Sequence, residues 1–482
     1  MKFIITTLSL FACLQTFAQV KLTKGSTSPQ FALSKQPRFT SFASDGGDYF
    51  VITKTERFQN IHTLINTDQA GNIISSKDIQ LNMGVVNNTF DGKEVLVVGN
   101  TPYLFVENHV KDGGKNTFTA RKIDNNGNVA ATGATIGSID ITKMSNPGSW
   151  YVSMSPDKKH VAVISISPYE KNIAQQIQYF ILDQDLKETA KGQFTFAGNT
   201  KQIGVYNFLA SNTGNLYIIS EDYDKTYKLP VIYAYKQGGQ RAIIPVMAAD
   251  PDIKNFSYTA SVNADGNLII GGYTQKRKTF SAGDPEATGT YLFNSAKPNE
   301  VKIFPFDKPV TNLTARNIVY NGDTFYLIGE QYKADKQKFT GSPLSPGALV
   351  DVFDYTHQNI MVTAYTNDLV KKFEMPLSRK FTGNEYDQDL MVASGIIRNK
   401  LALIYNDEYG KYFDDKYHRY IKTPVAVLIT NDGLMESPVN FANELDVKES
   451  TYKLYPQFFS NSKGRMVVLS GNDQSVTTNT FQ

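Results

Sequence analysis

The sequence predicts an all-β protein that folds as one β-propeller, with eight four-stranded blades in a single ring. Apolar strand cores recur along almost the whole chain, 52 to 76 residues apart. Polar turns rich in glycine and aspartate separate them, and 27 tyrosines and 30 phenylalanines against 19 prolines suit strands. The central residues of the strand cores are Phe50, Leu104, Ala162, Tyr217, Ile269, Tyr326, Ala402 and Val467.

The first repeat shows the expected four strands most clearly. They run over residues 38–43, 49–54, 61–67 and 73–81. The turns Asp45-Gly46-Gly47 and Asp68-Gln69-Ala70-Gly71-Asn72 lie between them and suit antiparallel hairpins. The second turn recurs in later repeats, beginning at Asp124, Asp183, Lys236, Asn367 and Asn431.

The two ends of the mature chain are predicted to complete one blade together. The last repeat, Lys453 to Leu469 with a third strand at Ser475 to Phe481, lacks an outer strand. Val20 to Gln36 has no repeat of its own, so we expect it to supply that strand and leave no open sheet edge. Seven blades is the alternative, if Glu94 to Val106 belongs to one enlarged unit.

The N-terminus has the features of a secretory signal peptide over residues 1–18, which leaves the propeller domain at residues 19–482. Lys2 precedes an apolar run, and Thr16-Phe17-Ala18 places small residues before a cut at Gln19. We expect a periplasmic or secreted protein of a Gram-negative-type bacterium. Lipid anchoring at Cys13 is the alternative. No stretch of the sequence is long and apolar enough for a transmembrane segment.

The charge balance and the cysteine count exclude several classes of protein. Cleavage removes one of the 49 basic residues, so 48 basic and 46 acidic side chains remain, a net charge of +2. This balance does not suit a nucleic-acid surface. Cleavage also removes the only cysteine, so the mature chain forms no disulfide and has no catalytic thiol. We expect a monomer.

The turn between the first two strands of several repeats carries a recognisable polar pattern. It begins at Ser155-Pro-Asp, Ser211, Ser261, Asn321 and Ser460. These segments resemble the Asp-box turns of sialidase-type propellers, without the tryptophan that ends that motif. The mature chain as a whole resembles secreted bacterial β-propellers. The resemblance implies an architecture and carries over no catalytic residue.

Motifs for metals and cofactors are not found in the sequence. The five histidines lie at least 47 residues apart, so none forms a pair with metal-ligand spacing. Asp124-Asn125-Asn126-Gly127 has its glycine two positions earlier than a calcium-binding EF-hand loop does. We expect no metal site and no cofactor; calcium binding by the acidic cluster Asp407, Glu408, Asp414 and Asp415 is the alternative.

The segments that follow the second strands are long and rich in tyrosine, so we expect them to form one rim. They cover residues 165–172, 220–228, 273–289, 330–349 and 406–422. Tyrosine suits recognition of a protein or glycan partner, although each ring could instead pack its own loop onto the blade. The candidate ligand-binding residues are Tyr223, Tyr273, Tyr332, Tyr409, Tyr412, Tyr417, Asp407 and Asp414.

A propeller-type hydrolase, such as a glycoside hydrolase, is the alternative function. This chemistry needs two facing carboxylates, which a sequence does not reveal by spacing. Whether the protein is an enzyme therefore stays open, and its catalytic residues are unknown. The candidate acids in the tyrosine-rich segments are Glu221, Asp222, Glu330, Asp407 and Glu408.

Overall fold

A computed structural model gives the architecture of the chain. It describes the backbone of residues 20–29, 38–44, 46–56, 59–79, 88–110, 114–141, 143, 145–195, 202–224, 227–236, 240–245, 253–276, 286–342, 345–384, 391–407, 413–414, 419–420, 423–441, 453–462, 464–472 and 475–482. Every element described is a β-strand. No helix in these ranges is long and apolar enough to cross a membrane.

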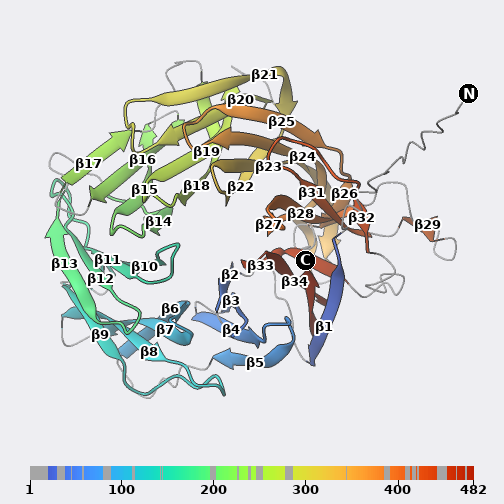
Figure 1. Cartoon of the computed structure of the whole chain (residues 1–482). Helices are drawn as coiled ribbons and strands as arrows, with labels where there is room; N and C mark the ends of the chain where they lie inside the picture. Colours follow the sequence, from blue (N-terminus) through green and yellow to red (C-terminus); the bar gives the residue numbers. More distant parts are fainter. Residues whose placement is uncertain are drawn as a thin grey trace, which may run out of the picture.

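Eight antiparallel sheets follow one another around a ring, which confirms the predicted eight-bladed β-propeller (Figure 1). Blades 1 to 4 follow chain order from the centre outwards. Blade 1 contains β2 (Arg38–Ala43), β3 (Asp48–Glu56), β4 (Gln59–Thr67) and β5 (Ile73–Ile79). Blade 2 contains β6 (Asn88–Val98), β7 (Thr101–Val110), β8 (Lys115–Lys122) and β9 (Ala134–Asp140). Blade 3 contains β10 (Ser149–Met154), β11 (Val161–Ile166), β12 (Ile177–Leu182) and β13 (Glu188–Phe194). Blade 4 contains β14 (Asn207–Ala210), β15 (Leu216–Asp224), β16 (Tyr227–Lys236) and β17 (Gln240–Pro245).

The remaining blades repeat the pattern with local additions. Blade 5 contains β18 (Ile253–Val262), β19 (Leu268–Lys276), β20 (Glu286–Asn294) and β21 (Val301–Thr311). Blade 6 contains β22 (Leu313–Asn321), β23 (Thr324–Ser342), β24 (Ser345–Thr366) and β25 (Lys371–Leu377), and β26 (Phe381–Asn384) also pairs with β24. Blade 7 contains β27 (Ala393–Ile397), β28 (Lys400–Asp407), β31 (Thr423–Ile429) and β32 (Val439–Asn440), with the separate pair β29 (Phe413–Asp414) and β30 (Arg419–Tyr420). Blade 8 contains β33 (Lys453–Ser462), β34 (Arg465–Asn472), β35 (Ser475–Phe481) and β1 (Leu22–Pro29).

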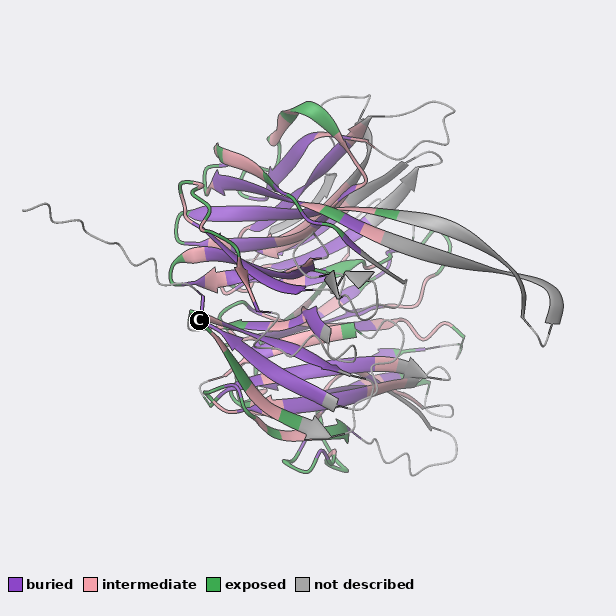
Figure 2. Ribbon diagram, turned by 90° about the vertical axis from the view of Figure 1, so that its right-hand side faces the viewer, coloured by how far each residue is buried: buried purple, intermediate pink, exposed green. Residues whose placement is uncertain are grey.

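The core lies between neighbouring blades, and the second strand of each blade runs through it (Figure 2). Each of the eight predicted central residues lies on a second strand and is at most 2% exposed. Apolar residues on both faces of these strands are expected when a sheet is covered by a blade on either side. The spacing of strand cores therefore predicted both the number of blades and their innermost hairpins.

The ends of the chain close the ring as predicted. β1 pairs antiparallel with β35, with Leu22 opposite Phe481, and the Lys21 amide donates to the Gln482 carbonyl at 3.0 Å. The seven-blade alternative is wrong, because residues 94–106 form the hairpin of β6 and β7 within an ordinary blade.

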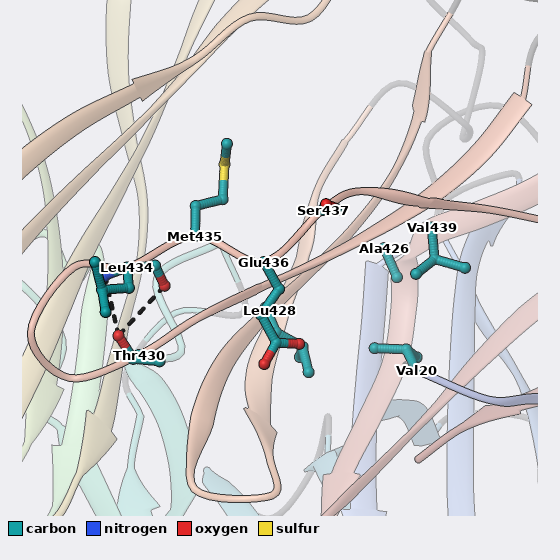
Figure 3. Close-up of a pocket in the computed structure, with 9 residues that line it drawn as sticks. All are labelled: Val20, Ala426, Leu428, Thr430, Leu434, Met435, Glu436, Ser437 and Val439. Atoms are coloured by element: carbon teal, nitrogen blue, oxygen red, sulfur yellow. Dashed lines mark hydrogen bonds between the residues drawn. The ribbon is translucent and has the colours of Figure 1, made fainter. Parts of the chain in front are cut away.

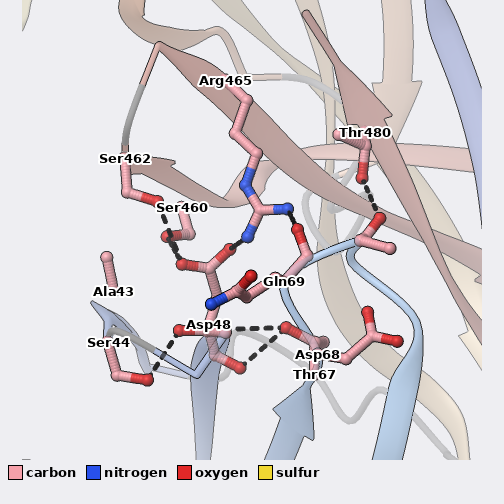
Figure 4. A network of polar contacts seen from close by, with 12 residues as sticks. Ala43, Ser44, Asp48, Thr67, Asp68, Gln69, Ser460, Ser462, Arg465 and Thr480 are labelled. Atoms are coloured by element: carbon pink, nitrogen blue, oxygen red, sulfur yellow. Dashed lines mark hydrogen bonds and ion pairs between the residues drawn. The ribbon is translucent and has the colours of Figure 1, made fainter.

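A polar latch joins the last blade to the first (Figure 4). The Asp48 carboxylate is 1% exposed and accepts hydrogen bonds from the hydroxyls of Ser460 and Ser462, at 3.1 and 3.2 Å. Arg465 pairs with the second oxygen of this carboxylate at 3.1 Å and also donates to the Gln69 carbonyl. The buried charge is therefore compensated by groups from the neighbouring blade.

The recurring aspartate turns form as expected. Asp68 Oδ1 accepts from the Asn72 amide at 2.7 Å, and Asp124 Oδ1 accepts from the Asn128 amide at 2.8 Å. In the turn that resembles an Asp box, Ser155 Oγ donates to Asp157 Oδ1 at 2.6 Å and accepts from the His160 amide at 3.1 Å. Side chains thus satisfy backbone groups that the tight turns leave unpaired.

The tyrosine-rich segments begin as strands rather than loops, which corrects the predicted boundaries. β15 continues to Asp224 and β19 to Lys276, while β23 and β24 reach 19 and 22 residues. Backbone hydrogen bonding between two strands continues past the point where the apolar pattern ends, so polar composition alone misplaced these boundaries.

Candidate functional site

The strands of each blade are antiparallel, so the connections between second and third strands all emerge on one face of the ring, here called the loop face. The opposite face carries the turns that join first to second strands. The predicted tyrosine-rich segments include these connections. At the part of this face between blades 6 and 7, the structure describes the side chains of Arg316, Tyr332 and Asp407.

The structure describes the side chains of three of the eight predicted ligand-binding residues. Tyr332 on β23 and Asp407 at the end of β28 are partly exposed. Tyr273 is 0% exposed and packs against Phe306, so it is a core residue and its assignment to the binding surface is wrong. The side chains of Tyr223, Tyr409, Tyr412, Tyr417 and Asp414 lie outside the described residues.

Glu330 is the centre of a buried charged cluster beneath the loop face. Its side chain is 0% exposed. Oε1 pairs with Arg379 at 2.5 Å and accepts from His357 Nδ1 at 2.6 Å, while Oε2 pairs with Arg316 Nε at 3.0 Å. These partners come from β22, β24 and the connection between β25 and β26. The Glu330 carboxylate on β23 therefore links β22, β24 and the connection between β25 and β26 within blade 6.

The surroundings of Glu330 keep its carboxylate ionised. Burial alone would raise its pKa, but hydrogen bonding to His357 and the charges of Arg379, His357 and Arg316 outweigh burial and lower the pKa from 4.5 to about 2. A carboxyl group of this kind holds no proton at neutral pH, and therefore has none to donate as a general acid.

Arg379 connects this cluster to blade 7. Its side chain is 0% exposed, and Nε donates to the Asn406 carbonyl on β28 at 2.9 Å. The guanidinium lies 5.6 Å from the ring centroids of both Phe381 and Tyr405. Asn406 in turn donates to the Leu454 carbonyl of blade 8 at 2.9 Å. Buried polar contacts therefore run across three consecutive blades.

Arg316 and Tyr332 bring the cluster to the surface. The Arg316 side chain is 26% exposed, and its guanidinium lies 5.3 Å from the Tyr332 ring centroid. The His357 ring also stacks on the Tyr332 ring, with the two ring centroids 5.8 Å apart. Among the described residues, only Glu330 forms a hydrogen bond with the Arg316 guanidinium. A partly exposed cation and an aromatic ring are thus held in fixed positions at the loop face.

Each blade carries a buried polar residue near the corresponding point of its second strand, three to five positions after the predicted central residue. This feature was missed in the sequence, because only an alignment of the eight strands shows it. All eight are at most 5% exposed. They are Thr53, Glu107, Ser165, Ser220, Thr274, Glu330, Asn406 and Ser470.

Glu107 in blade 2 is the second charged member of this series. It pairs with Lys93 at 2.6 Å and His109 at 2.8 Å, and accepts from Asn116 Nδ2 at 2.6 Å. Burial acts to raise the pKa of Glu107, but these partners lower it overall. The two buried glutamates are therefore both compensated anions, as structural ion clusters require.

In the ranges that the structure describes, no group of three or more histidine, cysteine, aspartate or glutamate residues is arranged to hold a metal ion. The paired positions of Glu330 with His357 and Glu107 with His109 each bring only two such side chains together.

Comparison with known proteins gives no family for this chain. No family model matches the sequence, and no curated protein matches it. Among solved structures, a prolyl endopeptidase is similar over 85% of this chain, at 10% identity and a TM-score of 0.36, and this chain spans only 55% of its length.

Two other solved structures match over most of their own length. The β-propeller domain of the Trilobed protease from Pyrococcus furiosus has 9% identity and a TM-score of 0.37, covering 85% of this chain and 96% of that one. A member of the DUF4221 family from Bacteroides vulgatus has 10% identity and a TM-score of 0.34, covering 87% and 99%. At these values the similarities support no statement about activity or ligand.

Proposed function

We propose that this protein is a secreted or periplasmic binding module that recognises a protein or glycan through the loop face between blades 6 and 7. The observation that supports this proposal is the pair Arg316 and Tyr332, held partly exposed by a fully buried anion. A planar cation beside an aromatic ring offers directed hydrogen bonds and a flat apolar surface. Both side chains lose little conformational entropy on binding, because the cluster already fixes them.

The hydrolase alternative is less well supported by the same cluster. A glycoside hydrolase needs one carboxyl group that is protonated near neutral pH, and Glu330 has its pKa lowered instead. Asp407 Oδ1 accepts a hydrogen bond from the backbone amide of Lys380 at 3.2 Å. The side chains of Glu221, Asp222 and Glu408 lie outside the described residues.

A glycan array and a pull-down from bacterial envelope extracts test the proposal, each with wild type and variants. Tyr332→Ala and Arg316→Ala should each lower retention of the ligand at least tenfold. The triple variant of Tyr409, Tyr412 and Tyr417 to alanine tests the remainder of the predicted rim.

Tyr103→Ala is the matched control, because Tyr103 is also partly buried on a second strand but lies near its opposite end, away from the loop face. This control should bind as wild type does. Full retention by Tyr332→Ala and Arg316→Ala, with ligands found for wild type, would show that this surface is scaffold.

A further inference from the structure

Blade 7 departs from the other blades at its outer edge. Its outer strand, β32, has two residues, whereas the outer strands elsewhere have 6 to 11. β32 pairs regularly with β31 at Val439 and Asn440. Before Val439 in the chain, the contact with β31 is a single backbone hydrogen bond, from the Glu436 amide to the Leu428 carbonyl at 2.9 Å. Between these two points, Ser437 and Pro438 lie outside the regular ladder.

A pocket of about 410 Å³ opens at this interruption. Its walls are mainly aliphatic, and Val20, next to β1 of blade 8, closes one end beside Ala426 and Val439 (Figure 3). Leu434 and Met435 stand at the other end, 66% and 49% exposed. The volume lies within the range of small-molecule sites.

The chemistry of the lining indicates what the pocket would hold. Leu428 and the aliphatic residues around it offer few partners for water, and cavities of that kind favour apolar occupants. Polar groups enter the lining at Thr430, Glu436 and Ser437. Lys400 pairs with Glu436 through Oε1, and is the only described residue that bonds to this carboxylate, which leaves Oε2 as an acceptor.

We infer that this pocket binds an unbranched alkyl chain whose polar end donates a hydrogen bond to Glu436. The chain would lie against Ala426, Leu428 and Val439, and Met435 would adapt its flexible thioether over the opening. The site lies at the outer edge of blade 7, so it is separate from the proposed Arg316 and Tyr332 surface. The inference therefore stands whatever ligand that surface binds.

Methionine-methyl NMR tests the inference with simple alcohols as probes. Titration with 1-octanol should shift the Met435 methyl signal in a saturable way, and leave that of Met391, a second exposed methionine, unchanged. Each methylene in an apolar site is worth about a fourfold change in affinity, so 1-hexanol should bind about fifteenfold more weakly. Octanoate should bind more weakly than 1-octanol, because its end only accepts hydrogen bonds.

Two variants that fill the pocket complete the test. Val439→Trp should abolish the saturable shift, because the larger side chain fills the pocket. Ser437→Trp should do the same, and because Ser437 is exposed this substitution should not disturb folding. Ile74→Trp, at a 63% exposed site on β5, is the control and should leave binding intact. A shift that never saturates, an equal shift at Met391, or undiminished binding in both pocket variants would overturn the inference.

Discussion

Replacing Glu330 with glutamine should lower the free energy of unfolding at pH 7 by about 3 kcal/mol. The glutamate pKa falls from 4.5 to about 2 on folding. That difference of roughly 2.5 pKa units corresponds to about 3 kcal/mol of stabilisation by the ionised carboxylate. The Glu330→Gln variant keeps the shape of the side chain but leaves Arg379, which is 0% exposed, without its buried counter-ion.

The effect should depend on pH in one direction. A carboxyl group with a lowered pKa stabilises the fold fully above its unfolded pKa, and the benefit is lost as pH falls towards the folded pKa. The difference between wild type and Glu330→Gln should therefore shrink by about 2 kcal/mol between pH 5 and pH 3.

Urea unfolding at several pH values measures this difference. Fluorescence of the single tryptophan follows unfolding, because Trp150 is buried in blade 3 and stacks on Phe118 with ring centroids 5.0 Å apart. Trp150 does not belong to blade 6, which contains the substituted residue. Glu188→Gln removes a partly exposed partner of Lys191 and serves as a control that should change stability little. A loss below 1 kcal/mol at pH 7, or a difference that stays constant from pH 7 to pH 3, would refute the reasoning.

The remaining predictions concern the closure of the ring and the core. Deleting residues 473–482 removes β35, which joins β34 to β1, so the thermal midpoint of the whole domain should fall; an unchanged midpoint would contradict closure by this strand. Arg465→Ala should cost about 2 to 3 kcal/mol in urea unfolding, because it takes a charged partner from the buried Asp48; a loss below 0.5 kcal/mol would mean that the two serines suffice. Tyr273→Phe should leave stability unchanged or raise it by about 1 kcal/mol, since the buried hydroxyl has no hydrogen-bond partner among the described residues, and a large loss in the same assay would reveal one.

The architecture was predictable because it depends on patterns that repeat within the sequence. Each blade needs an apolar second strand between two neighbours, so its position recurs whatever the details of the loops. The turns were also readable, because Gly71 adopts a φ of +88° and a Cβ there would lie 2.3 Å from Thr480 Oγ1. The unpaired last repeat predicted the partner strand at the other end of the chain for the same reason, since an open edge is unfavourable.

The candidate site was only partly predictable, because its contacts join residues far apart in sequence. Glu330 was among the candidate acids, yet its partner Arg379 lies 49 residues away and reverses the role suggested for it. Tyr273 was misplaced because a strand end and a loop start look alike when both contain tyrosine and glycine. Its burial depends on Gly329 in the next blade, where any Cβ would collide with the tyrosine hydroxyl at 2.2 Å.

The most direct test of the account is the titration of the Glu330 carboxylate itself. Carboxyl-labelled glutamate NMR, with the Glu330→Gln variant used to assign the signal, follows its ionisation as pH falls. We predict that the signal remains that of an ionised carboxylate from pH 8 to pH 4, because the pKa of Glu330 is about 2. The account requires this result, since it treats Glu330 as a permanent anion that holds Arg316 in place. A titration centred near pH 6 to 7 would contradict the account, and would instead favour a catalytic acid at the loop face.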